Sequence, residues 1–160
     1  MNQQITIYTD GSSLGNPGPG GFAFIMQWQN HQKEFSRGFY LTTNNRMELM
    51  AIIESMKQLK TQKYPVVIYT DSRYVADALN KGWLWKWEEK NFAKKQNPDL
   101  WKEFIGLYKK FDVTIEWIKG HNGHPSNERC DLLAKKAAEN PQHHDTYFEN
   151  IYKQKKNLFE

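Results

Sequence analysis

Hydrophobic and polar residues alternate along the N-terminal part of the chain, as they do in strands with one buried face. The alternation predicts three strands, at residues 5–9, 22–28 and 34–40, with a tight turn near residues 29–31. A loop rich in glycine and proline, residues 11–21, follows the first strand. Because short links join the three strands, we expect them to pair in antiparallel fashion.

The period of the hydrophobic positions changes at residue 45. Leucine, isoleucine and methionine side chains then recur at helical spacing, which predicts an amphipathic helix up to about residue 59. The elements expected after it are an apolar strand at 66–69, a helix at 74–79, a mixed helix and loop at 81–97, a helix at 100–111, a strand at 113–118 and a helix at 126–139. Helical crossovers make the two later strands parallel to the first. We therefore predict a mixed α/β sheet of five strands, three antiparallel and two parallel, flanked by helices.

Composition changes this picture little. The 160 residues suffice for one domain, and the 39% of hydrophobic residues argues against disorder. No apolar run approaches the roughly 18–20 residues of a membrane span. Cys130 is the only cysteine, which excludes an internal disulfide and a thiolate zinc cluster. We expect a cytoplasmic monomer without membrane contact, in which residues 1–141 form the folded domain and residues 142–160 a loosely ordered tail.

Positive charge gathers in one segment of the chain. Residues 81–95 carry five lysines against two glutamates, a net charge of +3 (five minus two), together with three tryptophans and Phe92. Lysines displace counterions from a phosphate backbone, and aromatic rings pack against sugars or bases. An amphipathic helix with its aromatic side chains in the core would show the same pattern. Composition alone leaves both interpretations open.

Four carboxylates are candidates for a metal site. Asp10 and Asp71 end predicted strands at the edge where sites gather in such sheets, Glu48 lies in the first turns of a helix, and Asp131 lies early in the last helix. Crowded carboxylates need a counter-charge, and all-oxygen ligands favour Mg²⁺ or Mn²⁺ over zinc. Each acid also has a structural interpretation: turn or cap residues for the two aspartates at strand ends, a capping box for Glu48, and favourable helix N-terminus electrostatics for Asp131. The residue pattern alone does not decide between these alternatives.

Six segments carry longer motifs. They are Tyr8–Ser12, Gly15–Gly21, Thr42–Leu49, Tyr69–Ser72, Gly120–Pro125 and Asn127–Asp131. In this order they resemble the type 1 ribonuclease H family, which includes bacterial ribonuclease HI. The resemblance runs from about Gln4 to Asn140, nearly the whole chain.

The resemblance implies a ribonuclease H-like fold, with residues 1–141 as the catalytic domain. It implies an endonuclease that hydrolyses the RNA strand of RNA–DNA hybrids and leaves 5′-phosphate and 3′-hydroxyl ends. In the family, acids at the positions of Asp10, Glu48, Asp71 and Asp131 bind two Mg²⁺ ions with the substrate, and Mn²⁺ is a substitute. His121 matches a histidine that handles protons or aids product departure. His124 is expected to pack at the start of the last helix.

The resemblance also implies contacts with the hybrid. The matching residues are Asn16, Thr43, Asn44, Asn45, Arg73, Trp83, Trp87, Lys86 and Lys90. The three asparagines would read the 2′-hydroxyl across the minor groove, although one of Asn44 and Asn45 is also expected to cap the helix. Thr43 would seat a DNA phosphate, and the aromatic and basic side chains belong to a protrusion over residues 81–97. Arg73 departs from the family, which often has glutamine there, and offers the groove a positive charge but no acceptor.

Two other classes of protein share some of these features. A DNA nuclease or resolvase-like enzyme on the same fold would keep the four carboxylates without needing asparagines to read a 2′-hydroxyl. A non-catalytic hybrid-binding module would keep the basic, aromatic segment but tolerate the loss of acids, and here all four are present.

Overall fold

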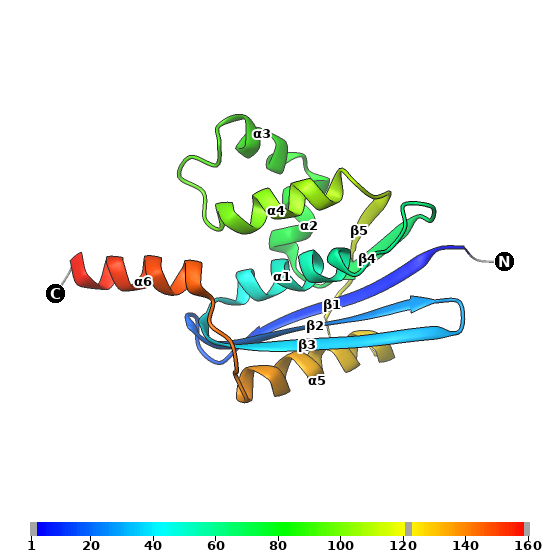
Figure 1. Ribbon diagram of the computed structural model, residues 1–160, viewed down its shortest axis with the longest axis horizontal. Helices are drawn as coiled ribbons and strands as arrows, with labels where there is room; N and C mark the ends of the chain where they lie inside the picture. The colour runs from blue at the N-terminus through cyan, green and yellow to red at the C-terminus, as the bar shows by residue number, and fades with distance from the viewer. Residues whose placement is uncertain (1–2, 121–122, 159–160) are drawn as a thin grey trace.

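A mixed sheet of five strands organises the chain (Figure 1). The strands are β1 (Ile5–Ser13), β2 (Gly18–Trp28), β3 (His31–Thr42), β4 (Val66–Thr70) and β5 (Val113–Trp117), in the spatial order β3-β2-β1-β4-β5. β2 pairs antiparallel with β1 and β3, whereas β4 pairs parallel with β1 and β5. This computed structural model describes residues 3–120 and 123–158, and it confirms the predicted strand directions.

The first two strands extend into the segment predicted to be a loop. β1 continues to Ser13, which pairs with Gly20 of β2. The prediction missed this pairing because glycines on β2 leave no alternating pattern of side chains. Asp10 therefore lies inside β1 and not at its end, but the parallel pairing with β4 stops at Tyr8. Asp10 thus still lies just beyond the parallel part of the sheet.

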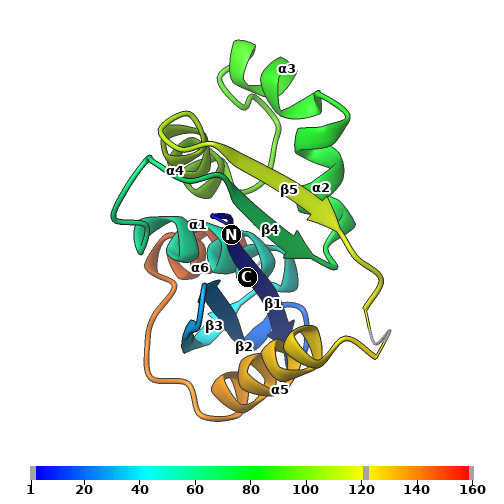
Figure 2. The same cartoon turned by 90° about the vertical axis from the view of Figure 1, so that its right-hand side faces the viewer.

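Helices cover both faces of the sheet (Figure 2). They are α1 (Asn44–Lys57), α2 (Arg73–Asn80), α3 (Trp83–Glu89), α4 (Pro98–Tyr108), α5 (Pro125–Glu139) and α6 (Thr146–Leu158). α1, α2 and α4 pack into the main hydrophobic core, which includes Ile7, Ile68 and the fully buried Trp101. Among the described residues, no helix is both long and apolar enough to cross a membrane.

α5 lies directly on the opposite face of the sheet. Gly21 and Gly38 face its backbone, and a Cβ added at either glycine would collide with a carbonyl oxygen of the helix. Elsewhere between α5 and the sheet, Tyr8, Ile25 and Cys130 form a small buried cluster. Because the helix approaches so closely, Asp131 is carried toward the edge of the sheet where Asp10 lies.

The chain after Pro141 differs from the loosely ordered tail that was expected. Asp145 is buried, and its carboxylate accepts hydrogen bonds from Nε of Arg46 at 2.7 Å and from Oγ1 of Thr42 at 2.7 Å. The same guanidinium binds both carboxylate oxygens of Asp99, at 2.9 and 2.8 Å. The helix α6 follows directly and extends away from the sheet (Figure 1). This anchor was not predicted because its partners lie about a hundred positions apart in sequence.

We predict that Arg46→Met lowers the free energy of unfolding by about 3–5 kcal/mol, because it leaves Asp145 buried and charged without its cation. The matched control is Arg37→Met, whose guanidinium lies 4.0 Å from Glu54 at a partly exposed position. That change should cost at most about 1 kcal/mol. Urea denaturation measures both values. Similar losses in the two variants would show that the buried cluster does not anchor the C-terminal segment.

Candidate functional site

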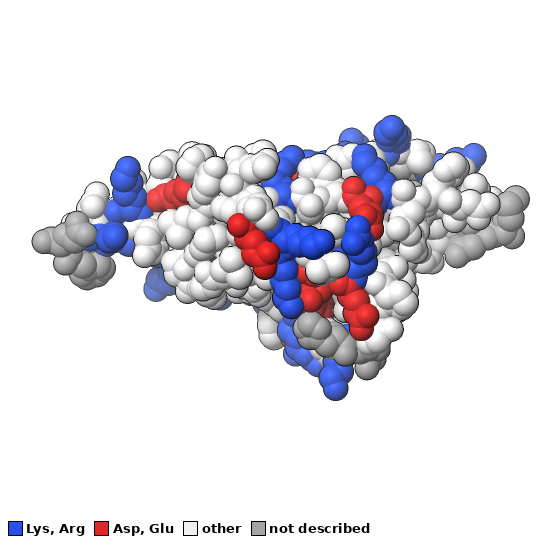
Figure 3. Space-filling view, turned by 90° about the horizontal axis from the view of Figure 1, so that it is seen from below, with Lys and Arg blue, Asp and Glu red and all other residues white. Residues whose placement is uncertain are grey.

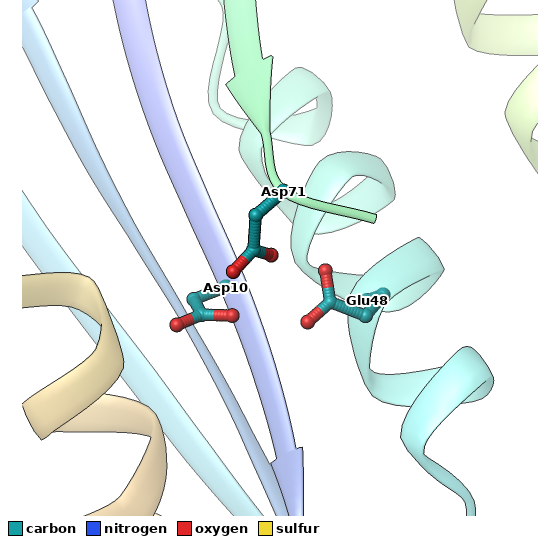
Figure 4. A group of neighbouring side chains, drawn as sticks. All are labelled: Asp10, Glu48 and Asp71. Carbon is teal, nitrogen blue, oxygen red and sulfur yellow. The ribbon is translucent and has the colours of Figure 1, made fainter. Parts of the chain in front are cut away.

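Three carboxylates point toward one another from three different elements (Figure 4). Asp10 projects from β1, Glu48 from α1, and Asp71 from the residue after β4. One oxygen of each lies within 4.8 Å of an oxygen of the other two. Asp10 and Glu48 are each only 4% exposed, and Asp71 is half-buried. The structure thus brings together three of the four acids singled out from the sequence.

The close approach of α1 to β1 depends on Gly11. A Cβ at this position would collide with the backbone nitrogen of Glu48, so a larger residue would push the helix away. The Gly11 N–H donates to Oε1 of Glu48 at 2.8 Å and to Oδ1 of Asp10 at 2.9 Å. One backbone donor is therefore shared between two carboxylates, which fixes both beside it.

Neighbouring residues, and not the acids, cap the two helices. Thr43 is the N-cap of α1, and its hydroxyl accepts from the N–H of Arg46 at 3.2 Å. The expectation that Asn44 or Asn45 caps this helix is therefore wrong, as is the capping-box interpretation of Glu48. Ser72 caps α2, which leaves the carboxylate of Asp71 free to face the other two acids.

Asp131 lies at the rim of this group. It lines the same hollow, but it is outside the cluster of three, and its Oδ2 lies 2.9 Å from Nζ of Lys135 one turn along α5. Its negative charge helps to raise the pKa values of Asp10 and Asp71. A metal-binding role for Asp131 remains a prediction.

The three clustered acids resist ionisation. Burial, and then the charge of Asp71, raises the pKa of Asp10 to about 8. Burial, and then the charges of Asp10 and Asp71, raises the pKa of Glu48 well above its usual range. Oε2 of Glu48 is buried and has no hydrogen-bond partner among the described residues. A divalent cation bound among these oxygens would favour their ionised forms.

The acids open into a polar hollow of about 420 Å³, which is also lined by Asn44, Asn45 and Arg73. A water molecule occupies about 30 Å³ of liquid, so the hollow has room for hydrated ions or a phosphate group. Asn16 belongs to the same surface, because its Oδ1 accepts from the N–H of Asn44 at 3.1 Å. The predicted asparagines therefore lie side by side next to the acids.

Of the two histidines in the loop before α5, the structure describes only His124. His121 lies outside the described residues, so its placement is not tested. His124 occupies the N-cap position of α5, where its ring packs on Tyr8 with centroids 4.7 Å apart. Nε2 of His124 lies 3.3 Å from the Tyr8 hydroxyl. The structure thus confirms the prediction that His124 is a packing residue at the helix start.

The basic, aromatic segment lies partly in the core and partly at the surface. Leu84 and Phe92 are buried in the core, whereas Trp83 is 42% exposed. Trp83 and Trp87 line a second hollow, and this hollow shares Arg73 with the carboxylate hollow. Its other lining residues are Tyr74, Asp77, Lys94, Lys95 and Gln96.

The lysines at this hollow are not the ones that were singled out. Lys86 and Lys90 are exposed but do not line it, whereas Lys94 and Lys95 do. The sequence signal for the latter pair was that they are consecutive lysines close to an aromatic residue, Phe92. Trp117 was also missed: its ring lies 4.0 Å from the Arg73 guanidinium, and its Nε1–H donates to the Asp71 carbonyl oxygen at 3.1 Å.

Comparison with known proteins gives consistent matches. A model of the RNase H family matches residues 2–139. The chain is 53% identical over 137 residues to a "Ribonuclease HI" of Helicobacter pylori, covering 86% of this chain and 94% of the relative. It is 46% identical over 154 residues to a "Ribonuclease H" of Enterobacter sp., covering 93% and 98%.

Solved structures share the fold. The crystal structure of LC9-RNase H1, described as a type 1 RNase H with the type 2 active-site motif, superposes with a TM-score of 0.78 at 30% identity. The match covers 89% of this chain and 75% of that one. LC11-RNase H1 in complex with RNA/DNA hybrid matches with a TM-score of 0.66 at 24% identity, covering 84% and 96%.

We predict that Asp10→Asn stabilises the metal-free protein at high pH. Because the pKa of Asp10 is about 8 when folded and near 3.8 otherwise, the folded state holds an extra proton between these values. The wild type therefore loses stability as the pH rises from about 4 to about 8. Without this ionisation, the variant should gain about 1–3 kcal/mol over the wild type near pH 8, and little near pH 4. Urea unfolding in EDTA at both pH values measures the difference, and a gain that is independent of pH would contradict the prediction.

Proposed function

This chain belongs to the ribonuclease H family, and we propose that it is an endonuclease that hydrolyses the RNA strand of RNA–DNA hybrids, leaving 5′-phosphate and 3′-hydroxyl ends. The observation that carries the proposal is the convergence of Asp10, Glu48 and Asp71 beside Asn44 and Asn45. Support also comes from the relatives named as ribonucleases H and from the related structure that holds an RNA/DNA hybrid.

The donor set of the carboxylate hollow fits a hard divalent cation. The ligands on offer are carboxylate oxygens, and one of them, Oε2 of Glu48, is buried without a partner in the described part of the chain. We propose that Asp10, Glu48 and Asp71, with Asp131 at the rim, hold two Mg²⁺ ions when substrate is present, and that Mn²⁺ can replace them. Bound there, the ions would activate water for attack on the phosphate and stabilise the leaving oxygen.

The asparagines beside the acids suit the choice of the RNA strand. An amide side chain both donates and accepts, so it can bind a 2′-hydroxyl in either sense, and DNA lacks this group. The bond between Asn16 and the backbone of Asn44 ties two such residues together at the entrance of α1. Arg73, stacked on Trp117, adds a fixed positive charge at the boundary with the aromatic hollow. We propose that these groups read the RNA strand as it crosses the acids.

The second hollow suits the partner strand. Trp83 and Trp87 offer aromatic surfaces for sugars or bases, and lysines at the same hollow, with the exposed Lys86 and Lys90 nearby in sequence, offer charge for phosphates. Thr43 uses its oxygen as an acceptor in the cap of α1, and the same hydroxyl can donate its hydrogen to a DNA phosphate.

His121 is proposed to handle protons at the reaction centre or to aid product departure. Its sequence neighbour Gly120 lies against Asp71, where an added Cβ would be 2.8 Å from Oδ2 of that acid. An imidazole has an ordinary pKa near 6.5, which suits proton transfer at neutral pH.

Cleavage of strand-labelled duplexes in Mg²⁺ tests the proposed function. Only the RNA strand of the hybrid should be cut, and not RNA duplex or DNA duplex, and EDTA should stop the reaction. Asp10→Asn should lower kcat/KM by at least about 100-fold, since it removes a central ligand. The matched control Asp112→Asn alters an exposed aspartate just before β5 and should leave activity unchanged. Cutting of DNA duplex would favour the resolvase-like alternative, and binding without cutting would favour a hybrid-binding module.

A further inference from the structure

Helix α6 stands out from the rest of the molecule, at the left of Figure 1 and of Figure 3. None of the residues that the structure describes in this helix is buried. Its root, by contrast, is fixed: Asp145 binds Arg46 inside the protein, and the ring of Tyr147 lies 5.3 Å from the same guanidinium. An isolated helix of this length is only marginally stable in water. An exposed helix whose first residues are anchored in the protein therefore points to a binding partner.

A groove runs between α6 and the body of the protein. Tyr147, Phe148 and Lys155 line it on the side of the helix. Thr43, Lys95 and Asn97 line it on the opposite side, and its volume is about 240 Å³. The groove therefore combines aromatic rings with basic side chains, the two kinds of group that bind a sugar–phosphate backbone.

The charge of the groove favours an anionic partner. No acidic side chain lines it within the described part of the chain. Neither Lys95 nor Lys155 forms an ion pair among the described residues, so their charges are not neutralised by the protein. A polyanion would be drawn to this groove.

The groove is continuous with the two hollows already described. It shares Lys95 and Gln96 with the aromatic hollow, which in turn shares Arg73 with the carboxylate hollow. On its other side it begins at Thr43, next to Asn44 of the carboxylate hollow. A duplex bound over the acids and the tryptophans would therefore extend toward α6.

We propose that α6 is an arm of the nucleic-acid surface, in which Lys155 and Tyr147 face Lys95 across the groove and bind the sugar–phosphate backbone of the hybrid. The proposal rests on the proposed function and deepens it. The arm reads no bases: it adds phosphate contacts beyond the site of cleavage. Its binding contribution is therefore electrostatic and sensitive to salt.

Two charge reversals on the same helix test this. Lys155→Glu alters the groove, whereas Lys153→Glu makes the same charge change at a residue that lines the opposite side of α6 with His144 and Tyr152. Both are introduced into full-length Asp10→Asn protein, so that the hybrid is bound but not cut. Binding of a hybrid of about two helical turns is measured over a series of NaCl concentrations.

Lys155→Glu should weaken binding about tenfold at low salt and reduce the slope of log Kd against log salt by about 1, as loss of one phosphate contact requires. Lys153→Glu should change both quantities by less than half as much. Lys155→Gln, which keeps a good helix former, should give an intermediate loss with the helix intact by circular dichroism.

Other outcomes would overturn the proposal. Wild-type affinity and salt slope in Lys155→Glu, or equal losses in the two reversals, would show that the groove does not bind the hybrid. If the wild-type protein, with both Asp10 and Lys155 intact, cleaves the hybrid while either of these results is found, the proposed function stands and only the role of α6 falls. If the wild-type protein neither binds nor cleaves the hybrid, the proposed function itself fails.

Discussion

The rest of the structure depends on one constraint: three carboxylates are held together in a mostly buried hollow, and no cation of the described chain pairs with them. Their mutual repulsion and burial oppose ionisation, so the metal-free site carries protons that would be released to solvent when a divalent ion binds. The absence of a side chain at Gly11 lets α1 pack against β1 at Glu48. The Gly11 N–H also donates to both Asp10 and Glu48, which partly offsets the unfavourable free energy of bringing these carboxylates together. The site is therefore assembled by packing and left to be neutralised by a ligand.

A second buried cluster of charges shows the opposite solution. Arg46 lies between Asp99 and Asp145 and satisfies both of them inside the protein. Glu48 follows two positions later on the same helix, and residues at this spacing project in different directions. The first turns of α1 thus contribute to two clusters: the Arg46 cluster, whose charges are paired within the protein, and the carboxylate cluster, whose charges are not. The Arg46 cluster fixes the start of α1 and the root of α6, and so sets the position of the residues that line the substrate surface.

Local patterns predicted much of the fold and of the site. The sheet followed from the periods of the hydrophobic residues, and Asp71 was located because parallel strands end at a common edge. Longer-range contacts escaped prediction. The anchor of Asp145 depends on Arg46, which is 99 positions away, and no local pattern marks it. The spacing of four residues on a helix predicts that Asp131 pairs with Lys135. The sequence does not show whether this ion pair competes with metal binding by Asp131. The residues around Trp83 stayed ambiguous because the segment is both core and surface.

Calorimetric titration of Mg²⁺ into the wild type and two variants of α1 tests most directly whether the clustered carboxylates form a cation site. Glu48→Gln removes a buried carboxylate of the cluster, whereas Glu54→Gln removes one that pairs with Lys57 on the same helix. We predict that Glu48→Gln weakens Mg²⁺ binding by at least about tenfold and that Glu54→Gln binds as the wild type does. Equal Mg²⁺ affinity in the wild type and Glu48→Gln would contradict the account.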